Sequence, residues 1–122
     1  MPWELDSDRP IYAQIVDRLK HEIVSGFYPP GSRLPSVRDL AAQASVNPNT
    51  MQKAFTELER TGLIVTRRTS GRTATEDTAL IEQVRSELAE LQISQFLTRM
   101  QHLGYQKDDS IRLLLAKKEE IS

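Results

Sequence analysis

Polar and basic side chains recur at helical spacing near the middle of the chain. They lie three or four residues apart and so share one helix face. The set is Asn49, Lys53, Thr56 and Arg60, with Gln52 beside it. Amides, hydroxyls and cations, with no carboxylate before Glu57, suit the base edges and phosphates of a duplex. A solvated surface face is the competing interpretation, and the neighbouring segments decide between the two.

The helix that must position this face has clear start and stop signals. Asn47 is suited to the N-cap, and Pro48 to the first helical position, because its missing N–H would have no partner there. Gly62 stands where a helix ends in a left-handed residue. The opposite face is apolar and consists of Met51, Ala54, Phe55 and Leu58.

A shorter helix is expected before it, from Ser36 to about Ala44. Ser36 as N-cap, with Asp39 three residues later, resembles a capping box, although Glu or Gln is the usual partner. Its buried stripe is Val37, Leu40, Ala41 and Ala44. The connection over residues 45–47 has the length of a helix-turn-helix corner. Arg38 lies off the stripe, placed either to reach a phosphate or base or to remain a surface cation.

A β-hairpin is expected after Gly62. Residues 63–66 form a β-prone run, residues 72–75 a weaker return strand, and Ser70–Gly71 the turn. Three cations, Arg67, Arg68 and Arg72, cluster at its tip without an acid nearby in the sequence. Beside a recognition helix, such a hairpin is interpreted as a wing on the phosphate backbone or in the minor groove.

The segment from Pro29 to Ile64, PPGSRLPSVRDLAAQASVNPNTMQKAFTELERTGLI, resembles the DNA-binding domain of GntR-family bacterial transcription regulators. The motif is PG-x-RLPS-x-R-x-LA followed by V-x-x-x-T-x-x-x-A-x-x-x-L-x-x-x-G-L-I, and the resemblance extends back to residues 10–12. It implies that Arg38, Asn47, Asn49, Thr50, Gln52 and the wing face DNA. The wing departs from the family pattern at Thr69, where glycine is common, and at Arg72, where threonine is common. The complete set expected at DNA is Arg33, Arg38, Asn47, Asn49, Thr50, Gln52, Lys53, Arg67, Arg68 and Arg72.

Charge is distributed unevenly, although the whole chain of 122 residues carries a net charge of only −1. Residues 27–75 hold seven Lys/Arg and three acids, whereas residues 76–122 hold six Lys/Arg and nine acids. A basic part for double-stranded DNA and an acidic part kept away from it is the simplest account.

Helices are expected on both sides of this region. Residues 9–25 repeat isoleucine or leucine every four positions before Gly26, and residues 29–31 form a rigid connector. From about residue 78 to His102, a long helix carries two offset apolar sets, and a last helix opens near Asp108. The fold class is therefore mainly α with a small β-wing: a winged helix-turn-helix (1–75) followed by two C-terminal helices (76–122).

The two C-terminal helices need somewhere to bury their apolar faces. They either pack back on their own domain or dimerise, and the double stripe favours a second copy. The residues expected to dimerise are Leu80, Ile81, Val84, Leu88, Leu91, Phe96, Leu97 and Met100. A short two-helix C-terminal part resembles the YtrA subfamily, which implies a homodimer.

Other classes have little support in the sequence. No cysteine, phosphate loop, metal-ligand spacing or catalytic triad is present, so no enzyme activity, metal or cofactor is expected. No apolar run reaches the length of a membrane span and no signal peptide is evident, which predicts a cytoplasmic protein. The sequence predicts a DNA-binding transcription regulator, and a repressor because blocking a promoter requires only occupancy. A winged helix used as a protein-interaction module is the alternative, and a small-molecule effector is left open.

Overall fold

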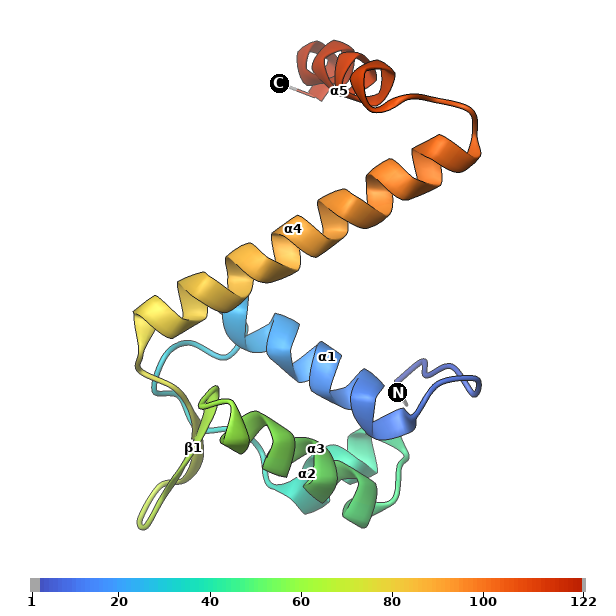
Figure 1. Cartoon of the computed structure of the whole chain (residues 1–122). Coiled ribbons are helices and arrows are strands. Elements are labelled where there is room, and N and C mark those ends of the chain that lie inside the picture. The colour runs from blue at the N-terminus through green and yellow to red at the C-terminus, as the bar shows by residue number, and fades with distance from the viewer. Residues whose placement is uncertain (1–2, 122) are drawn as a thin grey trace. The chain divides into compact units, whose positions relative to one another are not determined.

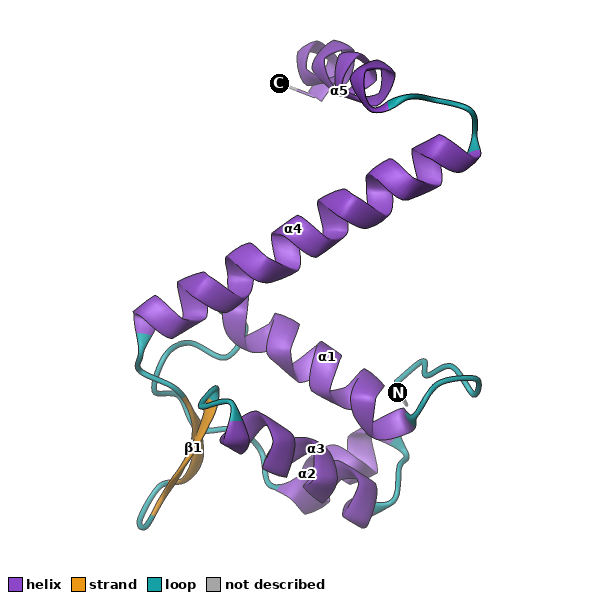
Figure 2. Ribbon diagram, viewed as in Figure 1, coloured by secondary structure: helices purple, strands orange, loops and turns teal. Residues whose placement is uncertain are grey.

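The computed structural model describes residues 3–121 (Figure 1). Figure 2 shows helices throughout this part of the chain, with one β-hairpin after the third helix. In chain order the elements are α1 (Ile11–Val24), α2 (Val37–Ala44), α3 (Pro48–Arg60), β1 (Ile64–Arg67), β2 (Gly71–Ala74), α4 (Thr78–His102) and α5 (Lys107–Ile121). The mainly helical fold with a small wing is as predicted. The chain divides into two compact units, the first ending at Arg85 and the second beginning at Ser86.

The core of the first unit lies among α1, α2 and α3. All four residues of the predicted apolar face of α3 are 0% exposed, and α1 contributes Ile15, Leu19 and Ile23. Leu34, Leu40, Leu63, Ile64 and Ala74 complete the centre of the cluster. Because each helix turns one apolar face inward, the polar face of α3 is left at the surface.

Local signals set the helix ends where they were predicted. The Asn47 side chain accepts a hydrogen bond from Asn49 N at 2.7 Å, and Ser36 Oγ accepts one from Asp39 N at 3.0 Å. Gly62 follows α3 with φ +88°, a left-handed conformation that glycine adopts without steric cost. Ser45, between α2 and α3, is also left-handed, with φ 58°.

The wing differs from its prediction by one residue. β1 pairs antiparallel with β2 from Ile64 opposite Ala74 to Arg67 opposite Gly71. Gly71 therefore belongs to the second strand, and a three-residue loop, 68–70, joins the strands.

Residues 32–34, which follow the expected rigid connector, pair with the wing. Leu34 N donates to Arg72 O at 2.9 Å, Ala74 N donates to Ser32 O at 2.8 Å, and Arg33 forms a bridge with Thr73. The segment thus adds a short third backbone partner to the free edge of β2. The Pro-Pro-Gly run just before these residues gives no strand signal, since proline and glycine are uncommon in strands, and the pairing was not predicted.

The first two turns of α4 pack on the winged helix. Asp77 caps the helix by accepting from Leu80 N at 3.0 Å. Leu80 and Val84 pack against the core cluster, and Ile81 is 8% exposed. Three residues expected at a dimer interface are therefore used within the first unit, which extends ten residues past the expected boundary at residue 75.

The second unit has little burial of its own. Gly104, with φ +98°, ends α4, and Tyr105 N donates to Met100 O at 3.1 Å. Ser110 on α5 is fully buried, with its hydroxyl donating to Gln106 O. Large apolar side chains remain exposed, among them Leu91, Ile93, Leu103, Ile111, Leu113, Leu114 and Leu115. None of the described helices is both long and apolar enough to cross a membrane.

Candidate nucleic-acid interface

The polar face of α3 is exposed, and one hydrogen-bonded pair orders its centre. Asn49, Gln52, Lys53 and Thr56 all lie at the surface. Gln52 Nε2 donates to Thr56 Oγ1 at 3.2 Å, and the Thr56 hydroxyl in turn donates to Gln52 O at 3.0 Å. This pairing gives the Gln52 amide a defined direction along the helix, which favours directional recognition of a base edge.

Lys53 is positioned by an aromatic side chain from α1. Its Nζ lies 3.9 Å from the centroid of the Tyr12 ring, a cation–π distance. The contact limits the rotamers of the long lysine side chain while its charge stays at the surface. This role of Tyr12 is not evident from the sequence, although the residue lies in the stretch that resembles the GntR family.

The basic face ends at an ion pair within α3. Arg60 Nε and Nη2 lie 3.0 and 2.5 Å from the two carboxylate oxygens of Glu57. The hydrogen bond from Arg60 lowers the pKa of Glu57, and the same bond raises the pKa of Arg60. Because its charge is offset locally, Arg60 is a weaker candidate for a phosphate contact than Lys53.

The wing arginines have acids near them that the hairpin sequence does not contain. Arg72 Nε lies 2.8 Å from Glu59 Oε1, and Arg67 Nη2 lies 3.8 Å from Glu76 Oε2. Arg68 is exposed in the three-residue loop. The cluster lacks an acid within the hairpin sequence, but the fold brings two acids to it, one from α3 and one from the segment after β2.

Two further cations expected at DNA come from outside α3 and the hairpin. Arg33 is exposed on the segment paired with β2, and its Nε lies 3.7 Å from where a Cβ on Gly71 would stand. Its side chain thus runs beside the wing. Arg38 is exposed in the first turn of α2. The fold accordingly brings Arg33 together with the wing cations, a grouping that is not evident from sequence distance.

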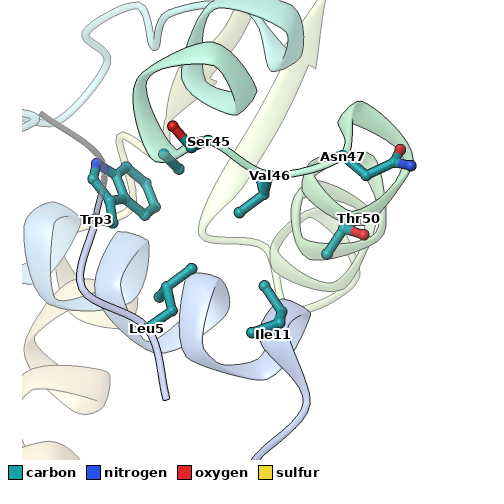
Figure 3. Close-up of a pocket in the computed structure, with 8 residues that line it drawn as sticks. Trp3, Leu5, Ile11, Ser45, Val46, Asn47 and Thr50 are labelled. Carbon is teal, nitrogen blue, oxygen red and sulfur yellow. The ribbon is translucent and has the colours of Figure 1, made fainter. Parts of the chain in front are cut away.

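A pocket of about 440 Å³ lies beside the helix-turn-helix corner (Figure 3). Its lining residues are Trp3, Leu5, Ile11, Ala44, Ser45, Val46, Asn47 and Thr50. Figure 3 shows Leu5, Ile11 and Val46 directed into the pocket and the Asn47 amide directed away from it. Asn47 therefore keeps its amide for the cap and the surface, while the pocket itself is mainly apolar.

The N-terminal segment that forms one wall of this pocket is held by a buried glutamine. Gln14, 7% exposed, accepts from Asp6 N at 2.7 Å and donates to Asp6 O at 2.7 Å. Arg18 lies 4.1 Å from the Trp3 ring centroid. These contacts hold the segment against α1, where it packs beside the corner before α3.

Among the described residues, no three His, Asp or Glu side chains gather in a metal-binding arrangement. His21 Nδ1 instead bonds Asp17 O of its own helix at 2.7 Å.

Comparison with known proteins identifies the class to which this surface belongs. Residues 11–73 match the model of the bacterial regulatory proteins of the gntR family. The chain is 40% identical to the transcriptional repressor YtrA of Bacillus subtilis over 100 residues, which cover 80% of this chain and 76% of that protein.

Solved structures agree with this match. A GntR family transcriptional regulator from Listeria monocytogenes superposes with a TM-score of 0.82 and 41% identity, covering 92% of this chain and 98% of that chain. The AraR DBD, solved in complex with operator ORX1, has a TM-score of 0.52 and 25% identity, covering 62% of this chain and 92% of that chain.

The chain belongs to the GntR family of bacterial regulatory proteins. Within the family it is YtrA-like, and it is a DNA-binding transcription regulator, as its sequence predicts. The relatives are transcriptional regulators rather than enzymes.

Proposed function

We propose that the protein is a transcriptional repressor that binds a two-fold symmetric operator as a homodimer. The observation that carries the proposal is the exposed polar face of α3 beside a wing bordered by Arg33, Arg67 and Arg68. Such an arrangement presents base-reading amides and phosphate-binding cations on adjoining elements.

The residues divide into two groups by their chemistry. Asn49 and Gln52 carry amides that can bond a base edge, and Gln52 is already directed by Thr56. Phosphates are assigned to the cations Arg33, Arg38, Lys53, Arg67 and Arg68, with Asn47 and Thr50 at the start of α3 beside them. Sequence preference thus comes from α3, and most of the salt-dependent affinity comes from the cations around it.

The second unit supplies the proposed dimer contact. Leu91 is 51% exposed, and Leu88, Phe96, Leu97 and Met100 are half-buried along the same helix. Covering them with a second copy removes apolar surface from water, which favours association. Leu80, Ile81 and Val84 are left out of this interface because they already pack on the first unit. The proposed division is therefore a DNA-binding part up to Arg85 and a dimerisation part beyond it.

A symmetric dimer presents two copies of α3 to two half-sites about one helical turn apart. Repression follows if the operator overlaps a promoter, since occupancy alone excludes polymerase, and the relative YtrA is named a repressor. The site of action is then the cytoplasm, where bacterial DNA lies. No effector is assigned.

Selection of bound fragments from a random duplex library, followed by footprinting, tests the proposal. The selected sequences should contain an inverted repeat, and the footprint should show two symmetric protected segments. An asymmetric single half-site bound with full affinity would contradict the dimer and the palindrome.

A further inference from the structure

The side chain of Glu59 joins the last turn of α3 to both strands of the wing. Its Oε2 accepts a hydrogen bond from the Thr66 hydroxyl at 2.8 Å, and its Oε1 accepts one from Arg72 Nε at 2.8 Å. Thr66 on β1 and Arg72 on β2 are directly opposite in the strand register. One carboxylate therefore bonds both members of a cross-strand pair and attaches that pair to α3.

Arg72 has a second contact on the same helix. Its guanidinium lies 5.4 Å from the ring centroid of Phe55, a fully buried residue one turn before Glu59. The side chains of Arg72 and Glu59 are only 31% and 30% exposed. Burial alone would raise the pKa of Glu59, but the hydrogen bonds from Arg72 and Thr66 and the charge of Arg72 outweigh it and lower the pKa.

The wing needs such an attachment because it is small. Each strand has four residues, and the only further backbone pairing within the described chain is the short one from residues 32–34 to β2, so the sheet remains small and marginally stable by itself. Ile64 and Ala74 bury its base, whereas Arg67 and Gly71 form the last pair before the loop. The Thr66–Arg72 pair lies between them, so its attachment to α3 sets the direction of the tip that carries Arg67 and Arg68.

We propose that Glu59 is a positioning residue for DNA binding, which fixes the wing on the recognition helix through the Thr66–Arg72 pair. We call this attachment of Glu59 to Thr66 and Arg72 the joint. Arg72 then belongs to the joint and does not bind a phosphate, in contrast to the expectation from the sequence. The inference rests on the proposed function, in which the wing tip contacts the DNA backbone.

A matched pair of variants separates the joint from a simple change of charge. Glu59→Gln and Glu57→Gln each remove one negative charge from α3, but Glu57 bonds Arg60 of the same helix instead of the wing. Hydrogen exchange of the amides of residues 64–74, measured in the free protein, should be about two- to fivefold faster in Glu59→Gln, the range of a partly exposed ion pair. Glu57→Gln should leave it unchanged. Equal exchange in the two variants would overturn the proposal.

A double-mutant cycle on duplex binding provides the second test. If Arg72 acts through Glu59, adding Arg72→Gln to Glu59→Gln should cause little further loss of affinity, because the joint is already broken. Exchanging the two residues, Glu59→Arg with Arg72→Glu, should restore slow exchange in the wing. Independent, additive losses would assign Arg72 to a phosphate and contradict the joint.

Arg68→Gln keeps this proposal distinct from the proposed function. It should reduce the slope of log affinity against log salt concentration by about one unit, which corresponds to the loss of one phosphate contact. If it does not, the wing–DNA contact fails, while the exchange result in the free protein still decides the role of Glu59.

Discussion

The two units of this chain differ in how much of their apolar surface they cover themselves. In the first, Phe55, Leu58, Ile15 and Leu19 are fully buried, and the polar face of α3 is left exposed. In the second, Leu91 is 51% and Leu115 62% exposed, and the described burial centres on Ser110. The first unit can therefore hold its fold and present a surface, whereas the second leaves apolar side chains exposed, which the proposed dimer would cover. In the proposed function this difference assigns DNA contact to the first unit and assembly to the second.

Removing the second unit should produce the largest effect. A fragment ending at Arg85 retains Leu80, Ile81 and Val84 and therefore the complete core. It should stay folded but become monomeric, and it should lose roughly 10²–10⁴-fold in operator affinity because the two half-sites are no longer linked. Its base preference should persist. Sedimentation measures the oligomeric state of the fragment, and duplex titration measures its affinity and base preference. A fragment that remains dimeric with full affinity would place the interface in the first unit.

A pair of alanine substitutions compares the units at single residues. Phe55→Ala should lower the free energy of unfolding by about 3–5 kcal/mol, independent of protein concentration, because it leaves a cavity in the core. Leu91→Ala should leave unfolding of the first unit unchanged and weaken only self-association. Denaturant titrations at two protein concentrations distinguish these outcomes. Equal, concentration-independent losses would show that the second unit has a core of its own.

Within the first unit, the base-reading and phosphate-binding groups should respond differently. Gln52→Ala should cost about 1–3 kcal/mol on the best site and relax its preference at one base pair. Arg68→Ala should weaken all duplexes evenly and flatten the salt slope by about one unit. Binding to selected and unrelated duplexes over a salt series measures both effects. If Gln52→Ala weakened every sequence equally, α3 would not be reading bases.

The smallest effect is expected at the corner between α2 and α3. Ser45 has a left-handed backbone, which is strained for a residue with a Cβ. Ser45→Gly should therefore raise the free energy of unfolding by about 0.5–1 kcal/mol, since relief of strain exceeds the entropy of the added glycine. A thermal melt measures the change. A lower melting temperature would mean that the Ser45 side chain supports the corner.

The sequence predicted the helices well because their ends depend on local chemistry. Asn47, Pro48 and Gly62 act through their own backbone or their nearest neighbours, and all three mark helix ends as expected. The register of the two wing strands was harder to predict from the sequence. Glycine is compatible with a turn and with the start of a strand, and the structure places Gly71 in the strand.

The missed features of the site all join segments that are distant in sequence. Glu59 and Arg72 are thirteen residues apart, and Tyr12 reaches Lys53 from another helix. No periodicity encodes such contacts, because they depend on how α1, α3 and the wing pack. The first compact unit continues past residue 75 to Arg85 for the same reason: in the sequence Leu80 and Val84 belong to one apolar stripe with later residues, and only the fold shows that they pack on the core.

The central claim is that two copies of this chain, joined through residues after Arg85, read one symmetric site. Sedimentation of the full chain on a selected duplex, with each half-site intact or scrambled, tests it most directly. Two chains should bind the intact duplex. Scrambling one half-site should reduce affinity roughly 10²–10⁴-fold, as in the fragment that ends at Arg85. A single chain bound per duplex, with affinity unchanged when either half-site is scrambled, would contradict the account.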